Sequence, residues 1–314
     1  MPHPGRKIFG GTQLSNRILW IAAAFFILFL IIGSFVFVLP FDALFHRLPF
    51  YEELSSGLLF TFENYLVSFL PLLVWLLFYC FISKKNRFLL DTLKAKKGSL
   101  SALGKGLLFG FLMNGACVLA AWLHRDIVLE PNFALSEIPF YLLALGCVFI
   151  QSTTEEAWCR GFLQERIHIH YPFWLAALLN AAIFGALHLM NPGISKLAVV
   201  NLVLTGAAYS FAMKATGSIW FPMGLHTAWN FTQNYLFGLP NSGLVSEISV
   251  FRLTAANARD TLIYDNLFGV EGSIPACIVT AALLLSCLCF TWKKGRGKEL
   301  LNSKEKEGFK EGNV

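Results

Sequence analysis

The sequence predicts an all-α, polytopic membrane protein. Of its 314 residues 56% are apolar and only 14% are charged, whereas an ordinary soluble domain has about 25% charged residues. Several apolar runs approach the roughly 20 residues that a helix needs to cross a bilayer. The net charge of +6 comes from Lys and Arg between these runs and at the C-terminus, where anionic headgroups would meet them. This distribution does not favour nucleic-acid binding.

Eight apolar segments are expected to span the membrane as helices, because an open sheet edge cannot satisfy its hydrogen bonds in lipid. The first follows Arg6, Lys7 and Arg17, but it is too long for a signal peptide and no small-residue cleavage site follows, so we interpret it as an anchor. Pro71 is expected to kink the second span. The predicted spans are 18–39, 58–82, 106–123, 139–150, 172–190, 194–212, 219–237 and 275–292.

Charges in the connecting segments predict the orientation. Basic segments, of which 84–97 is the strongest, alternate with acidic or mixed ones, as the positive-inside rule requires. This predicts a multi-pass protein of the cell membrane with both termini in the cytoplasm. We expect a cytoplasmic N-terminal segment at 1–17, one membrane domain at 18–293 and, from the Lys/Glu-rich composition, a disordered cytoplasmic tail at 294–314.

The fourth apolar run continues without a break into a charged stretch, Gln151-Ser-Thr-Thr-Glu-Glu-Ala-Trp-Cys-Arg160. Each charge at membrane depth costs roughly 2.5–3.5 kcal/mol on the insertion scale, so a helix without a use for these groups should not carry them. Glu156 and Arg160 are four residues apart and can pair. Glu155 points about 100° away and has no evident local partner. The pattern predicts one buttressed carboxylate and one that faces a cavity.

Two further apolar runs carry polar groups: Phe184-Gly-Ala-Leu-His188 and His226-Thr-Ala-Trp-Asn230. The spacing places His226 and Asn230 on one helix face. Together with Glu155, these side chains have two obvious uses, and the sequence leaves both open. Glu155, His188 and His226 suit a zinc ion with an activated water. Without metal, Glu155 and His188 would activate water while His226 and Asn230 donate to an oxyanion.

EExxxR, FxxxH and HxxxN, in this order on three separate apolar segments, resemble the three motifs of the CAAX protease and bacteriocin-processing (CPBP or Abi) family, which includes the type II CAAX prenyl endopeptidases. The resemblance covers about 139–237. It implies an eight-helix intramembrane protease, often called a metalloprotease. Residue by residue, it implies that Glu155 and His188 activate water and that His226 and Asn230 stabilise the oxyanion. Glu156 and Arg160 would support the site.

The expected activity is therefore intramembrane endopeptidase cleavage of membrane-associated or lipidated, CAAX-type peptides. The expected partners are membrane lipids and a membrane-bound peptide or protein substrate. HExxH and Gly-x-Ser-x-Gly are absent from the sequence, which argues against a zincin-type protease or a serine hydrolase. Two alternatives remain open at this point: a transporter whose charged side chains line a solute path, and a non-catalytic scaffold or immunity protein of the same fold.

Overall fold

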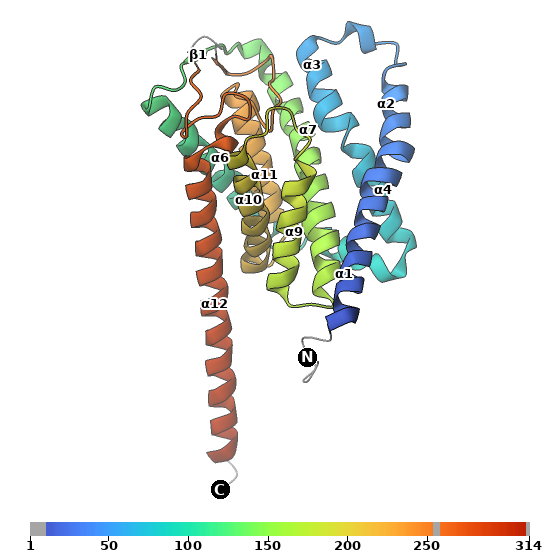
Figure 1. Ribbon diagram of the computed structural model, residues 1–314, viewed down its shortest axis with the longest axis vertical. Coiled ribbons are helices and arrows are strands. Elements are labelled where there is room, and N and C mark those ends of the chain that lie inside the picture. The colour runs from blue at the N-terminus through green and yellow to red at the C-terminus, as the bar shows by residue number, and fades with distance from the viewer. Residues whose placement is uncertain (1–10, 254–257, 312–314) are drawn as a thin grey trace. The chain divides into compact units, whose positions relative to one another are not determined.

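The computed structural model describes residues 11–253 and 258–311, and these residues are predominantly helical (Figure 1). Within them, six helical segments are long and apolar enough to cross a membrane. These are Arg17–Phe45, Ser56–Ile82, Ser99–Leu123, Leu135–His168, Lys196–Thr216 and Ile274–Lys294. The prediction of an all-α, multi-pass membrane protein is confirmed.

The fifth and seventh predicted spans are helical but shorter than expected. Helix α9 (Phe173–Leu187) has 15 residues, and α11 (Trp220–Phe231) has 12, followed by the five-residue π-helical segment η7 (Thr232–Leu236). Apolar composition continues past the end of α9, to Met190, where the backbone has already turned. Composition alone therefore overestimates the length of this helix.

The chain divides into two compact units, which are described separately here. Unit 1 comprises Met1–Lys94 and Leu135–Asn180, and unit 2 comprises Ala95–Ala134 and Ala181–Val314. The boundary falls inside α9. The three predicted sequence motifs are therefore divided as well, since the EExxxR motif belongs to unit 1 and the FxxxH and HxxxN motifs belong to unit 2.

In unit 1, the predicted second span is interrupted as expected. Ser68 and Phe69 separate η3 from α4, because the ring of Pro71 clashes with the carbonyl four residues earlier, at Val67, where η3 ends. The elements of this unit are α1 (Gly11–Phe26), η1 (Ile27–Val38), α2 (Leu39–Phe45), η2 (Tyr51–Glu53), α3 (Ser56–Thr61), η3 (Phe62–Val67), α4 (Leu70–Ile82), η4 (Lys84–Asn86), α5 (Phe88–Leu93), η5 (Leu135–Glu137), α7 (Ile138–Glu156), η6 (Ala157–Gln164), α8 (Glu165–His168) and the first part of α9.

Trp158, in η6, contacts three other helical segments of unit 1. Its side chain is fully buried, and its indole N–H donates to the carbonyl oxygen of Leu72 at 3.2 Å. The rings of Phe25 and Phe29 lie against it, with centroid distances of 5.9 and 5.1 Å. The helix that carries the charged motif is thus fixed against α4 and against the first span.

Unit 2 contains α6 (Ser99–Leu123), β1 (Leu129–Pro131), the last part of α9, α10 (Lys196–Thr216), α11, η7, β2 (Phe251–Leu253), η9 (Val270–Gly272) and α12 (Ile274–Glu311). Helices α6 and α11 pack closely through glycine. A Cβ on Gly106 would clash with the carbonyl of Phe221, and one on Gly110 would clash with the carbonyl of Leu225. The Gly106-x-x-x-Gly110 pattern therefore serves helix packing.

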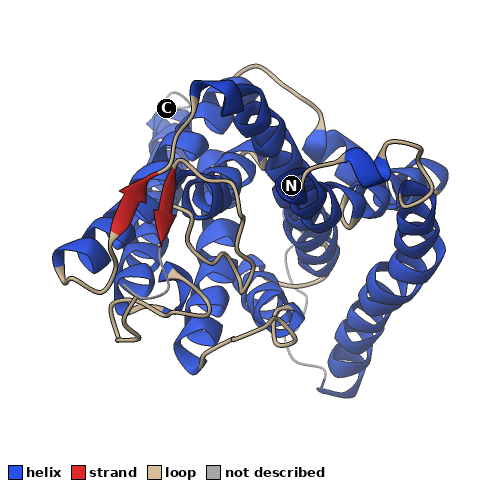
Figure 2. Cartoon of the chain, turned by 90° about the horizontal axis from the view of Figure 1, so that it is seen from above, coloured by secondary structure: helices blue, strands red, loops and turns tan. Residues whose placement is uncertain are grey.

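Two loops of unit 2 are joined by the antiparallel pair β1 and β2 (Figure 2). Leu129 pairs with Leu253, Glu130 with Arg252 and Pro131 with Phe251. Next to the sheet, the buried carboxylate of Asp126 accepts from Thr261 Oγ1 at 2.7 Å. The long segment between η7 and α12 is thereby held against the loop that follows α6.

Helix α12 continues to Glu311, through much of the segment expected to be a disordered tail, and is visible as the long red helix of Figure 1. Side chains after Lys294 and residues 312–314 lie outside the described residues, as do residues 1–10 of the N-terminal segment. The assignments of 1–17 and 294–314 as cytoplasmic segments stay predictions.

Candidate active site

The acidic motif occupies the junction of α7 and η6 in unit 1. Arg160 Nη1 donates to Glu156 Oε1 at 3.0 Å, and both side chains are fully buried. The predicted ion pair is confirmed. From Ala157 to Gln164 the helix is π-helical and every side chain is buried.

Glu155 is half-buried and does have a neighbour on its own helix. Gln151 Nε2, one turn earlier, donates to Glu155 Oε1 at 2.6 Å, and Ser152 Oγ donates to Gln151 Oε1 at 3.1 Å. The expectation that Glu155 has no local partner is wrong, because Gln151 has the i, i+4 spacing that lets an amide reach a carboxylate. The carboxylate is thus oriented by Gln151, whose own amide oxygen accepts from Ser152.

His188 lies at the end of α9, in unit 2. Its Nδ1 is 2.8 Å from the carbonyl oxygen of Phe184. A carbonyl can only accept, so Nδ1 must carry the proton. In the neutral ring, the lone pair is then on Nε2, which is the nitrogen available to a water or a metal ion.

His226, on α11, lies beside the same phenyl ring as His188, that of Phe184. The ring of Phe184 is 4.8 Å from the His188 ring and 6.4 Å from the His226 ring, measured between centroids. Tyr209, from α10, approaches His226 to 5.7 Å. Asn230 follows His226 by one helical turn, and both are buried, at 6% and 7% exposure. Unit 2 therefore gathers the two predicted imidazoles around one phenyl ring.

Sequence reasoning missed Glu271, a carboxylate in η9 that is only 6% exposed. Its Oε2 accepts from the backbone N–H and from the hydroxyl of Ser242, both at 2.8 Å. Burial raises the pKa of Glu271, while the Ser242 hydrogen bonds and the nearby His188 and His226 oppose this shift. Glu271 is therefore within electrostatic reach of both imidazoles.

The segment that carries Ser242 is fastened to the turn after α9. Asn191 Nδ2 donates to the Ser242 carbonyl at 3.2 Å, and the Asn191 N–H donates to the His188 carbonyl at 2.9 Å. Gly243 has a φ of +89° and lies so close to the Pro192 carbonyl that a Cβ would clash. His188, Ser242 and Glu271 are thus linked by hydrogen bonds through Asn191. No motif in the sequence marks Glu271, because it follows His226 by 45 positions within a loop of mixed charge.

The described residues contain no group of three or more His, Cys, Asp or Glu side chains placed so that they could hold a metal ion. The three predicted zinc ligands come from both units, with Glu155 in unit 1 and the two His in unit 2. The zinc site stays a prediction, as does the meeting of Glu155 with the imidazoles.

Fold and side chains together define a multi-pass helical membrane protein whose apolar helices carry carboxylate and imidazole groups of the kind that hydrolases use. Residues 137–232 match the family described as type II CAAX prenyl endopeptidase Rce1-like. The match covers a little under a third of the chain and confirms the resemblance to the CAAX protease family seen in the three motifs. The matched segment includes Glu155, Glu156, Arg160, His188, His226 and Asn230, but not Glu271. Searches among curated proteins and among solved structures gave no match.

Proposed function

We propose that this protein is an intramembrane endopeptidase that hydrolyses peptide bonds of membrane-associated or lipidated, CAAX-type peptides. The observation that carries the proposal is the pairing of His188 and His226 around Phe184, with the His188 Nε2 lone pair defined by the Phe184 carbonyl. The Rce1-like match over the same helices supports it, because that family consists of proteases.

The proposed reaction uses water as the nucleophile. Glu155 and His188 accept a proton from the water as its oxygen attacks the scissile carbonyl carbon. His226 and Asn230 donate hydrogen bonds to the oxyanion that forms on the carbonyl oxygen. The carbon–nitrogen bond then breaks, and the amine leaves with the proton that the water supplied. The mechanism requires unit 1 to present Glu155 to the imidazoles of unit 2, which is part of the proposal.

The remaining polar groups support this chemistry. The buried Glu156–Arg160 pair neutralises the helix that carries Glu155, and we assign Glu271 the role of a positioning residue. Its carboxylate accepts two hydrogen bonds from Ser242, and Asn191 ties Ser242 to the backbone of His188, so Glu271 fixes the loop beside this imidazole.

Zinc is a separate part of the proposal. Glu155, His188 and His226 are the residues that would hold the ion, and carboxylate and imidazole are donors that zinc accepts. When bound, zinc would make the attacking water more acidic. A strong chelator should then abolish activity and added zinc should restore it. Full activity of protein that metal analysis shows to be free of zinc would remove the ion from the proposal.

We also propose that both termini are cytoplasmic, based on the basic segments. The loop between η7 and α12, which carries Glu271, is then on the opposite side of the membrane, because α12 crosses once between this loop and the C-terminus. Reporter fusions after α6 and at the C-terminus would test the orientation. Equal reporter signals from both positions would contradict it.

The decisive test is cleavage of a farnesylated CAAX-type peptide by purified protein in proteoliposomes, followed by mass spectrometry of the products. Glu155→Gln removes the base while keeping the shape, and is expected to reduce the rate by roughly 10²–10⁴-fold. Glu165→Gln, further along the same run of helix, is the matched control and should leave the rate unchanged. Comparable rates for Glu155→Gln and wild type would remove Glu155 from the mechanism.

The same preparation separates the alternatives. Solute or proton flux without any cleaved peptide would favour a transporter. Full complementation of a deletion strain by both Glu155→Ala and His188→Ala would favour a non-catalytic scaffold or immunity protein.

A further inference from the structure

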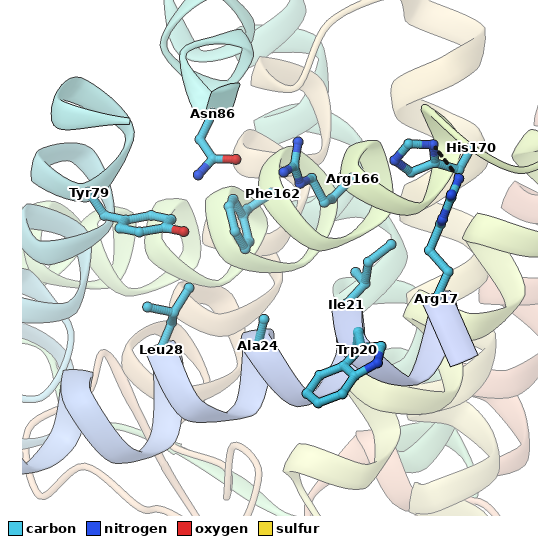
Figure 3. Close-up of a pocket in the computed structure, with 10 residues that line it drawn as sticks. All are labelled: Arg17, Trp20, Ile21, Ala24, Leu28, Tyr79, Asn86, Phe162, Arg166 and His170. Atoms are coloured by element: carbon cyan, nitrogen blue, oxygen red, sulfur yellow. Dashed lines mark hydrogen bonds between the residues drawn. The ribbon is translucent and has the colours of Figure 1, made fainter. Parts of the chain in front are cut away.

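Unit 1 contains a pocket that the proposed chemistry does not use. It lies between the first span, the end of α4 and the segment from η6 to the turn after α8 (Figure 3). Arg17, Arg166 and His170 lie toward one end, and apolar side chains such as Phe162 and Leu28 extend toward the other. The pocket is therefore amphipathic, with a cationic end and an apolar end.

The two arginines are not neutralised. Arg17 Nη1 lies 3.4 Å from His170 Nδ1, and Arg166 Nη1 donates to the Lys85 carbonyl at 3.4 Å. Both contacts are long for hydrogen bonds. Among the described residues, no carboxylate forms an ion pair with either arginine. The guanidinium groups are therefore available to an anion that brings its own oxygen atoms.

Asn86 gives a second, independent indication of a ligand. It lines the pocket and is 2% exposed. Its Nδ2 donates to Ser83 Oγ at 3.0 Å, but its Oδ1 is buried without a hydrogen-bond partner. A buried acceptor left unpaired costs free energy, so a ligand with a hydroxyl or ammonium donor would be stabilised there.

The position of the pocket indicates the source of the anion. The pocket lies beside the basic segments that precede the first span and follow α4. These segments are the ones assigned to the cytoplasmic surface, where anionic phospholipids are found. Trp20, which lines the pocket and is 74% exposed, is the residue type that gathers at the headgroup level.

We propose that this pocket binds one anionic phospholipid of the cytoplasmic leaflet. The phosphate lies between Arg17 and Arg166, a headgroup donor meets Asn86 Oδ1, and an acyl chain follows the apolar wall formed by Ile21, Ala24 and Phe162. The proposal concerns unit 1 alone and does not depend on the endopeptidase activity.

Native mass spectrometry of the full chain released from nanodiscs would test it. Discs of phosphatidylcholine alone are compared with discs that also contain phosphatidylglycerol, which is anionic and carries headgroup hydroxyls. We expect one retained phosphatidylglycerol per protein. Arg17→Gln with Arg166→Gln should lower its occupancy by about tenfold or more, because hydrogen bonds to charged groups are strong. Lys84→Gln with Lys94→Gln, which removes two exposed charges of the same unit outside the pocket, is the matched control.

Ala24→Phe provides a variant that fills the apolar part and leaves the charges in place, and it should also reduce retention. Inorganic phosphate and the soluble glycerophosphoglycerol headgroup should not displace the lipid, since neither has an acyl chain. The proposal is overturned if phosphatidylcholine is retained equally, if the lysine control loses as much lipid as the arginine variant, or if the pocket variants keep it.

Discussion

The acidic helix of unit 1 and the imidazole pair of unit 2 place polar groups in apolar surroundings in different ways. In unit 1 the partners are one helical turn apart: Glu156 with Arg160, and Glu155 with Gln151. In unit 2, His188, His226 and Glu271 come from α9, α11 and η9, and loops hold them together. Pairing within a helix forms as soon as the helix forms, whereas the second arrangement depends on tertiary packing.

This comparison predicts first that His188→Ala has a large effect on activity and a small one on folding. Loss of a general base reduces the rate by roughly 10²–10⁴-fold, while the half-buried ring at a helix end contributes little packing. Peptide cleavage and thermal unfolding in detergent should be measured on the same preparation. A large fall in the unfolding temperature with proportionate loss of activity would instead make His188 structural.

Arg160→Met should have the opposite profile. It leaves the fully buried Glu156 without its guanidinium, and breaking a buried pair costs about 3–5 kcal/mol. The double variant Glu156→Gln with Arg160→Met should recover part of this loss, because no charge then stays buried. Denaturant unfolding of the single and double variants checks the prediction, and equal stability of both would contradict it.

Two glycines of α6 provide a matched pair of variants that tests helix packing in unit 2. Gly106→Ala places a Cβ against the Phe221 carbonyl and should destabilise by about 1–3 kcal/mol. Gly104→Ala, two residues earlier on α6, meets nothing within 4 Å and should be neutral or slightly stabilising, because alanine favours helix. Thermal unfolding of the two variants distinguishes them, and similar losses would mean that α6 does not pack as described.

Glu271→Gln should change the pH dependence of stability. Because burial raises the pKa of Glu271, the carboxyl group of Glu271 binds its proton more tightly in the folded state than in the unfolded state. Wild-type stability should therefore decrease as the pH rises from the ordinary glutamate range, about 4.3, through the higher folded pKa. The variant should lack this decrease.

The measurement is the unfolding temperature as a function of pH, with Glu247→Gln in the same loop as control. Parallel curves for wild type and Glu271→Gln would show that the carboxylate is not buried as described. In the peptidase assay, Glu271→Gln should lower kcat more than it changes KM, because a positioning residue acts through the imidazoles.

How much the sequence predicts follows from the same contrast. Six of the eight predicted spans, the Glu156–Arg160 pair and the break before Pro71 are found among the described residues, and each depends on residues close together in the sequence. Glu271 could not be found, because its burial depends on Ser242 and on Asn201 of α10, which contact it from elsewhere in the chain. The sequence predicts an end of α9 that is too late, because hydropathy does not detect the backbone turn that follows Leu187.

The hydrogen bond from His188 to the backbone of Phe184 separates two contributions of that phenylalanine. Its carbonyl sets the tautomer, and any residue at position 184 would provide it as long as α9 keeps its last turn. Its ring is what touches both imidazoles. An aliphatic replacement at this position would therefore preserve which nitrogen carries the proton, yet release the two rings from their common support.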